Sequence, residues 1–370
     1  MRIPRPRIPR PPAALLARSR TVTAIAATGT LLAGSVLAGV LASAAPAASA
    51  GTSHQGRLPA FLYAPYFETW TSDSIPAVAR QSGSRYLTLA FLQTLKKGSC
   101  TLAWNGAKRQ LVQPGGRYVA QIRQLRAAGG DVIPSFGGYS ADQGGTEIAD
   151  SCSSVSKIAQ AYESVVTTYG VTRLDMDVEA KSQDNKAGIA RRSAAIALLQ
   201  RWAARHHRQV QIDFTLGVEP GGLASDCLHV LRSALAAGVK ITTVNIMAFD
   251  YYNSQHDSDM GTEAIEALNS VHTQLAGLYP HLSARRLWRM EGITLLPGID
   301  DFPRRTEVTY LSEAQDVMYY AQTHPISLIT IWAIQRDKGG CPGAIDSNSC
   351  SGITQSPWEF SHLLEAYTRR

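Results

Sequence analysis

Three acidic residues stand at alternate positions in one short segment. Asp175, Asp177 and Glu179 are separated by the apolar residues Met176 and Val178. Successive side chains of a β-strand point to opposite faces, so the three carboxyls would share one face. Carboxylates crowded on one face repel one another, and at least one should hold its proton near neutral pH. A carboxylic acid with a raised pKa is what general acid catalysis of glycosidic cleavage requires.

Two other kinds of structure would place acids at the same spacing. One is an acidic edge strand that faces solvent, and the other is a Ca²⁺ or Mg²⁺ site. The chain carries no zinc-ligand spacing, no phosphate-binding loop and no Gly-x-Ser-x-Gly nucleophile turn. We therefore expect no metal and no cofactor. The elements around the acids must decide between catalysis and an edge strand.

Apolar runs alternate with helix-like stretches after residue 57. The runs are Phe61–Phe67, Tyr86–Leu92, Asp131–Gly137, Thr172–Glu179, Gln211–Val218, Thr242–Phe249, Arg289–Leu296 and Ser327–Ile334. The helix-like stretches are Tyr118–Ala128, Val155–Tyr169, Gly188–His206, Leu223–Ala237, Gly261–Leu278, Ser312–Thr323 and Pro357–Tyr367. This alternation indicates parallel strands with crossover helices, and eight strands close a barrel.

The predicted fold class is therefore α/β, a (β/α)8 TIM barrel that forms one catalytic domain over residues 58–370. The alternative is an open doubly wound sheet, which usually carries a glycine-rich phosphate loop after its first strand. Residues Glu68–Ser72 follow the first run here and contain no glycine. The barrel is the better prediction.

The chemistry of a TIM barrel takes place at the C-terminal ends of its strands. Glu179 ends the fourth run, and Ser135–Tyr139 ends the third. Asp250–Asn253 follows the sixth run, and Trp332 lies near the end of the eighth. Four separate segments thus meet at one rim, which favours a catalytic site.

Polar and aromatic residues also follow the first run. Tyr66, Glu68 and Trp70 could line the same cleft. The alternative is that this aromatic cluster serves packing, as such clusters more often do.

Together these segments resemble glycoside hydrolase family 18, the chitinases and related endo-N-acetylglucosaminidases. The family's D-G-x-D-x-D-x-E signature aligns with 172–179, where the last three acids match but the first Asp and the Gly do not. Its S-x-G-G aligns with 135–138, and its M-x-Y-D with 247–250, where Phe249 stands in the Tyr place. Its eighth-strand Trp corresponds to Trp332. The segments 292–298 and 332–337 resemble a secreted bacterial chitinase subgroup, and the resemblance spans roughly 60–345.

The resemblance implies retaining hydrolysis assisted by the substrate, an exception to the usual two-carboxylate scheme. The sugar's own acetamido oxygen would attack the anomeric carbon. Glu179 would protonate the leaving oxygen and then act as the base toward water. Asp177 would accept a hydrogen bond from the acetamido N–H, and Asp175 would share a proton with it as a coupled pair. The alternative for Asp175 is a buried structural acid.

The resemblance also implies residues that bind the substrate. Trp332 would form the apolar floor under the sugar, unless it is a core residue that fills the barrel. Gly137 and Gly138 would let the backbone approach the sugar closely, unless they only form a turn at the end of the strand.

The sixth run departs from the family pattern in one residue. Phe249 lacks the hydroxyl that a Tyr would give to the acetamido carbonyl, and the loss of one such donor can cost about 10²-fold. Tyr251 or Tyr252 could supply the hydroxyl from the following loop. Asp250 could line the site near the acetamido group, or it could cap the next helix.

The first 50 residues predict a signal peptide. They contain six Arg and no acid, then an apolar run from about Val22 to Val40 and a cleavage site at Ala48-Ser49-Ala50. The alternative is an uncleaved membrane anchor. The +7 net charge comes mostly from this leader, and 30 basic residues face 29 acids without it. The charge therefore gives no support for nucleic-acid binding.

The chain has five cysteines, and disulfides are expected in a secreted protein. Cys341–Cys350 is the nearest pair and would close a short loop. Cys100–Cys152 would join two loops that each follow a predicted strand. Cys227 is left over in a helical pattern and is expected to be a buried thiol.

The sequence thus predicts a secreted, monomeric enzyme that cleaves β-1,4-linked N-acetylglucosamine polymers. Cleavage of internal bonds is expected, since only Pro297–His324 separates the last two runs and no domain is inserted there. No membrane association is expected after signal cleavage. One alternative is an endo-N-acetylglucosaminidase that acts on N-glycans. A second is a non-catalytic chitin-binding lectin, and a third is a structural barrel without a glycan.

Overall fold

The computed structural model describes residues 58–252, 259–300, 307–345 and 347–369. The described residues belong to one compact unit. The predicted signal peptide at residues 1–50 lies outside the described part of the chain.

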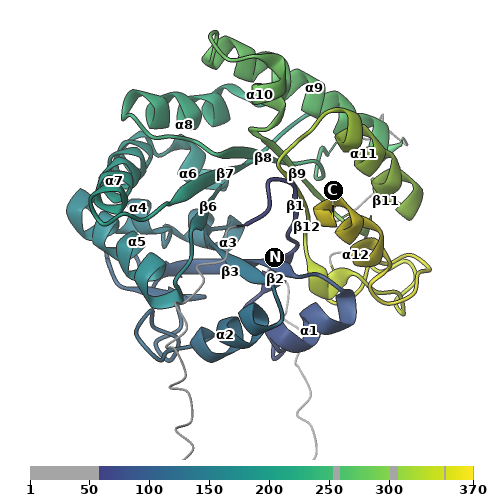
Figure 1. The fold of residues 1–370 in the computed structure, drawn as a ribbon, viewed down its shortest axis with the longest axis horizontal. Helices are drawn as coiled ribbons and strands as arrows, with labels where there is room; N and C mark the ends of the chain where they lie inside the picture. Colours follow the sequence, from purple (N-terminus) through teal and green to yellow (C-terminus); the bar gives the residue numbers. More distant parts are fainter. Residues whose placement is uncertain (1–57, 253–258, 301–306, 346, 370) are drawn as a thin grey trace, which may run out of the picture. The chain divides into compact units, whose positions relative to one another are not determined.

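Parallel strands form a closed barrel (Figure 1). In order around the barrel they are β1 (Leu62–Tyr63) with β2 (Tyr66–Glu68), β3 (Tyr86–Thr94), β5 (Asp131–Gly137), β6 (Arg173–Val178), β7 (Gln211–Gly217), β8 (Thr243–Met247), β9 (Glu291–Leu295) and β12 (Leu328–Ile331). The first barrel strand is split around Pro65. Its first half pairs with β12 and its second half with β3, which closes the ring. The prediction of a (β/α)8 barrel is confirmed.

Helices surround these strands (Figure 1). The long ones are α1 (Ile75–Ser82), α2 (Val119–Ala127), α5 (Val155–Tyr169), α7 (Lys186–Arg205), α8 (Ser225–Ala236), α9 (Met260–Leu278) and α11 (Leu311–Thr323), and α12 (Glu359–Leu364) is shorter. Short helices at the rims are α3 (Tyr139–Gly144), α4 (Ile148–Ser151), α6 (Ala180–Asp184) and α10 (Ala284–Trp288). Within the described residues, no helix combines the length and apolarity needed to cross a bilayer.

Helix α5 shows why the sequence predicts these elements well. Ser154 caps its first turn through a hydrogen bond from the Lys157 N–H. Ile158, Tyr162 and Val165 recur at helical spacing and are buried. Gly170 then ends the helix in the left-handed conformation, with φ of +63°.

Both predicted disulfides are formed, and Cys227 is a buried free thiol as predicted. Cys100–Cys152 lies next to a strand that the sequence pattern did not reveal, β4 (Leu102–Trp104), which pairs antiparallel with the end of β3. A short hairpin, β10 (Gly298–Ile299) with β11 (Val308–Thr309), also went unpredicted. Such two- and three-residue strands are too short to show a periodicity.

Candidate active site

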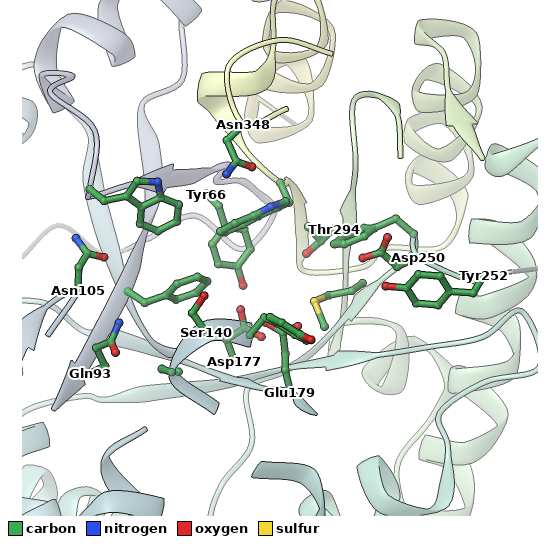
Figure 2. Close-up of a pocket in the computed structure, with 18 residues that line it drawn as sticks. Tyr66, Gln93, Asn105, Ser140, Asp177, Glu179, Asp250, Tyr252, Thr294 and Asn348 are labelled. Carbon is green, nitrogen blue, oxygen red and sulfur yellow. The ribbon is translucent and has the colours of Figure 1, made fainter. Parts of the chain in front are cut away.

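A cavity of about 510 Å³ opens at the C-terminal ends of the barrel strands (Figure 2). Its lining comprises Tyr66, Trp70, Phe91, Gln93, Asn105, Gly137, Tyr139, Ser140, Ala141, Asp177, Glu179, Met247, Phe249, Asp250, Tyr252, Thr294, Trp332 and Asn348. Figure 2 shows Asp177 and Glu179 together on one wall. Gln93 and Asn105 lie toward one end of the cavity, and Asp250 and Tyr252 toward the other. An elongated ligand could therefore extend along the cavity and pass over the two acids.

Strand β6 presents its acids to the barrel interior. Met176 and Val178 pack in the apolar core between barrel and helices, so the alternate residues Asp175 and Asp177 point inward. Asp177 and Glu179 line the cavity, and Asp175 lies beneath them, 3% exposed. The strand is paired on both sides, with β5 and β7, so it is not an edge strand.

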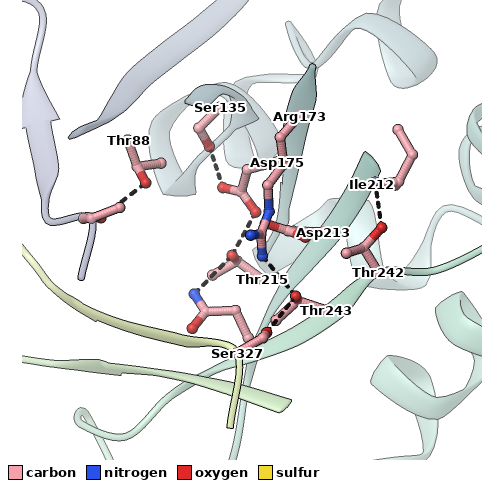
Figure 3. Close-up of polar contacts among 12 residues, drawn as sticks. Thr88, Ser135, Arg173, Asp175, Ile212, Asp213, Thr215, Thr242, Thr243 and Ser327 are labelled. Atoms are coloured by element: carbon pink, nitrogen blue, oxygen red, sulfur yellow. Dashed lines mark hydrogen bonds and ion pairs between the residues drawn. The ribbon is translucent and has the colours of Figure 1, made fainter. Parts of the chain in front are cut away.

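Three hydroxyl groups from three other strands surround the Asp175 carboxylate. Its Oδ2 accepts hydrogen bonds from Tyr66 Oη at 2.9 Å and from Ser135 Oγ at 2.6 Å, and its Oδ1 accepts one from Thr215 Oγ1 at 2.7 Å. Figure 3 shows two of these contacts within the polar interior of the barrel. Because each donor stabilises the ionised form, Asp175 is the member of the acid pair best prepared to carry the negative charge.

The pKa values of all three acids are raised above their usual range. Burial and the nearby Asp213 raise the pKa of Asp175 to about 6. Burial, and then the charges of Glu179 and Asp175, raise the pKa of Asp177 well above its usual range. Burial raises the pKa of Glu179 to about 7, against an opposing hydrogen bond from the Tyr139 backbone. Near neutral pH the pair Asp175–Asp177 therefore holds one proton, and Glu179 is balanced between its acid and base forms.

A fourth charged residue lies on the inner face of β6. Arg173 donates to Asp213 Oδ2 at 2.5 Å and to Thr243 Oγ1 at 2.7 Å, and both members of the ion pair are buried (Figure 3). Arg173 aligns with the Gly of the family signature. No sequence pattern indicates its partner Asp213, which lies 40 residues away. Arg173 lies two residues before Asp175 on β6, and Asp213 is the register partner of Asp175 on β7.

We expect Arg173→Met to lower the free energy of unfolding by about 3–5 kcal/mol, because it leaves the Asp213 carboxyl buried without its cation. Urea denaturation followed by circular dichroism measures the change. The matched control is Arg201→Met on the exposed face of α7, for which a change within about 0.5 kcal/mol is expected. Equal midpoints for the two variants would contradict a stabilising role of the buried pair.

A cluster of aromatic rings lines the same cavity as the acids. Trp332 stacks on Phe91 with ring centroids 5.4 Å apart and contacts Tyr66 at 5.5 Å. Trp70 extends the cluster at 6.1 Å from Trp332 and is 45% exposed. The half-buried Trp332 lines the cavity rather than filling the barrel, so an apolar sugar face can pack against this cluster.

The two glycines after β5 are required by their surroundings. Gly137 has φ of +98°, and a Cβ there would lie 2.1 Å from the Asp177 carbonyl oxygen. Gly138 has φ of +82°, and its Cβ would lie 2.5 Å from the Phe91 ring. Both positions therefore exclude a side chain. Gly137 lines the cavity as predicted, whereas Gly138 packs under Phe91 and is not part of the lining.

The loop after β8 corrects one prediction. Tyr251, expected to face the substrate, is 4% exposed and is absent from the cavity lining. Its neighbour Tyr252 lines the cavity and is 61% exposed. The physical reason is the backbone: Asp250 and Tyr252 both have φ of +54°, and Tyr251 N donates to Glu307 Oε2 at 2.9 Å. These turns direct the Tyr251 side chain into the protein interior. They leave the Tyr252 side chain at the cavity, which Phe249 and Asp250 also line.

Several lining residues carried no catalytic motif and were missed. They are Phe91, Gln93, Asn105, Ser140, Ala141, Thr294 and Asn348 as members of the lining. Gln93 and Thr294 lie at the C-terminal ends of predicted strands, so their positions alone could have identified them. Asn348 could not be found this way, because it lies in the loop closed by Cys341–Cys350. Within the described ranges no group of three or more His, Cys, Asp or Glu residues is arranged to hold a metal ion.

This barrel and its acidic strand define a family of sugar-cleaving enzymes. The sequence profile of the Glycosyl hydrolases family 18 matches residues 63–283. The chain therefore belongs to glycosyl hydrolase family 18. Within that family it is similar to proteins named as chitinases.

Individual relatives agree with this assignment. The chain is 32% identical over 325 residues to a probable bifunctional chitinase/lysozyme of Escherichia coli K12, covering 84% of this chain and 35% of that protein. It is 32% identical over 290 residues to Endochitinase 11 of Metarhizium anisopliae, covering 75% of this chain and 53% of that protein. The chain thus spans about a third of the first relative and about half of the second.

A solved structure matches most of the fold. The catalytic domain of a hyperthermophilic chitinase from Pyrococcus furiosus superimposes with a TM-score of 0.72 and 28% identity, covering 85% of this chain and 97% of that chain. This similarity agrees with the barrel and with the family, both predicted from the sequence.

Proposed function

We propose that this protein hydrolyses β-1,4-linked N-acetylglucosamine chains, in chitin or in soluble oligosaccharides, by retaining catalysis assisted by the substrate. One observation carries the proposal: Asp177 and Glu179 line the same cavity as the aromatic cluster around Trp332. A sugar packed on that cluster would present its acetamido group and its glycosidic oxygen to the two acids. The relatives named as chitinases support the substrate class.

Each acid has a distinct part in the proposed reaction. The acetamido oxygen attacks the anomeric carbon while the bond to the leaving oxygen breaks, and Glu179 gives its proton to that oxygen. Asp177 accepts a hydrogen bond from the acetamido N–H and stabilises the positive charge of the oxazolinium ring. Glu179, now a carboxylate, takes a proton from water, which attacks the anomeric carbon and reopens the ring. One water is consumed, and the configuration is retained because the carbon is attacked twice.

Hydrolysis of amino-sugar oligomers tests the function directly. Mature protein is incubated with N-acetylglucosamine oligomers and, in parallel, with cellulose oligomers of equal length. We expect cleavage of the former alone, because cellulose lacks the acetamide that acts as the nucleophile. Cleavage of both would reject the substrate-assisted mechanism. Binding of the amino-sugar oligomers without cleavage would favour a lectin. A lectin is the second candidate because Phe249, which lacks the Tyr hydroxyl of the family pattern, lines the cavity.

Cleavage of internal bonds is the expected mode of action. Between β9 and β12 the described chain contributes only the β10–β11 hairpin and α11, so no further domain closes over the cavity there. We expect a hexamer of N-acetylglucosamine to yield dimer, trimer and tetramer early in the reaction, and soluble oligomers to be cut faster than crystalline chitin. Chromatography of the early products measures this. Dimer released as the sole early product would contradict endo action.

The proposed site of action is outside the cell. The basic leader with its small-residue cleavage site and the two disulfides both suit an oxidising, extracellular environment. We propose that the mature protein acts there as a monomer.

A further inference from the structure

Asp142 is a buried carboxyl that contacts the segment carrying Glu179. It lies on α3, directly after the Gly137–Gly138 turn, and is 1% exposed. Its Oδ2 accepts a hydrogen bond from the backbone N–H of Glu179 at 2.6 Å. This bond joins helix α3, which follows β5, to the residue directly after β6. No sequence pattern indicated it, because the two residues are 37 positions apart.

The backbone at Glu179 needs such support. Glu179 is extended, with φ of −130° and ψ of 174°, and the next residue, Ala180, has φ of +43°. A non-glycine residue in the left-handed region costs roughly 1–2 kcal/mol and persists only where its surroundings enforce it. The side chain of Gln183 fixes the residue before Glu179 by donating to the Val178 carbonyl at 3.0 Å. Asp142 fixes the N–H of Glu179 itself.

Asp142 lies within electrostatic reach of a buried cluster of charged residues. Burial and the charge of Glu147 raise the pKa of Asp142, while Arg192 opposes this. Arg192 pairs with Glu147 at 2.9 Å, and both side chains are 1% exposed. Asp150 accepts from Asn185 Nδ2 at 2.8 Å and from Ser182 Oγ, which anchors the far end of α6. The turn that carries Glu179 is therefore fixed at both ends, by Asp142 at the Glu179 N–H and by Asp150 at Ser182.

We propose that Asp142 is a positioning residue, which orients the Glu179 carboxyl toward the glycosidic oxygen by fixing the backbone N–H of Glu179. The inference rests on the proposed function. Either oxygen acceptor at this place, carboxyl or amide, can hold the N–H. Loss of the acceptor frees the turn at Glu179 and misplaces the acid, and a misplacement of about 1 Å can cost 10²-fold in rate.

Kinetics on two leaving groups test the role of Asp142. We expect Asp142→Ala to lower kcat on N-acetylglucosamine oligomers by about 10–100-fold, with KM changed less than about threefold. A dinitrophenyl glycoside of the same sugar needs little protonation to leave, so its cleavage should fall less than about threefold. Asp142→Asn keeps an acceptor oxygen and should retain most of the activity. The control, Asp184→Asn on the exposed face of α6, should match the wild type.

Amide hydrogen exchange gives a readout that does not depend on activity. We expect the Glu179 N–H to exchange at least about tenfold faster in Asp142→Ala and near the wild-type rate in Asp142→Asn. Unchanged exchange in Asp142→Ala, or equal rate losses on both substrates, would overturn the positioning role. A wild type that cleaves neither substrate would instead overturn the proposed function, while the exchange rates would still decide the role of Asp142.

Discussion

Glu179→Gln is expected to lower turnover of N-acetylglucosamine oligomers by about 10²–10⁴-fold, the usual contribution of a positioned general acid. The amide keeps the shape of the side chain but cannot give a proton to the leaving oxygen. Binding should persist, because the aromatic cluster around Trp332 and the rest of the cavity are unchanged. Calorimetry with the hexamer measures the affinity, and product release measures the rate.

Glu219→Gln is the matched control, since Glu219 is an exposed glutamate just beyond the end of β7 and is absent from the cavity lining. It should keep wild-type rates. If Glu179→Gln retained most of its activity, another residue would have to be the acid, and the proposed mechanism would be wrong.

The same residue predicts the pH dependence of the wild type. Glu179 must be protonated to act as the acid, so the rate should fall as the pH rises through about 7. The acid pair Asp175–Asp177 must hold one proton, so the rate should also fall as the pH drops through about 6, where Asp175 becomes protonated. A bell-shaped profile of kcat/KM between these limits is expected. The residual rate of Glu179→Gln, measured at a saturating protein concentration, should not fall as the pH rises through 7.

The raised pKa of Glu179 also makes the stability of the protein depend on pH. Its pKa is raised in the folded protein, from 4.5 to about 7. Its contribution to stability is therefore full below about pH 4.5 and is lost as the pH rises through 7. Glu179→Gln removes this loss, so its Tm should exceed the wild-type value at pH 8 and approach it at pH 4.5. Equal Tm differences at both pH values would contradict a raised pKa.

Asp177→Ala is expected to lower kcat by about 10²–10³-fold, because it removes both the acceptor for the acetamido N–H and the carboxyl that shares one proton with Asp175. Asp177→Asn keeps an acceptor oxygen but cannot share that proton, so its loss should be smaller. Burial and three neighbouring acids raise the pKa of Asp177, so both variants remove a buried group whose ionised form is destabilised and should be at least as stable as the wild type.

Initial rates and Tm values of the two Asp177 variants test this prediction. The control is Asp226→Asn in the first turn of α8, which is not part of the cavity lining. A rate loss of equal size in Asp177→Ala and Asp177→Asn would mean that the carboxyl is required and that an acceptor oxygen alone does not help. No loss in either would mean that Asp177 does not orient the acetamido group.

The repeating elements could be predicted because their signals are local. Strand β5 and helix α5 have the bounds that the pattern predicted, since apolar periodicity and a terminal glycine define both. The first run was predicted as continuous, but the strand divides around Pro65, which has no N–H to donate. The alternation of acids on β6 follows from the geometry of any strand and was equally predictable.

The cavity was only partly predictable. Strand ends placed Tyr66, Asp177, Glu179 and Trp332 on one rim, as the structure does. Which of Tyr251 and Tyr252 lines the cavity depends on positive φ angles in this loop. Residue types other than glycine do not predict such angles. Phe91 and Asn348 were missed because aromatic and amide residues occur in many contexts without chemistry.

The sequence by itself determined the strand that bears three acids, the barrel that must contain it and the family to which it belongs. Periodicity and motif are properties of neighbours along the chain, so no coordinates were needed for them. Only the tertiary structure decided which groups meet these acids: Tyr66 lies 109 positions from Asp175, and Asp142 lies 37 from Glu179. Those contacts arise when the barrel closes and brings distant strand ends together, and no local pattern encodes them.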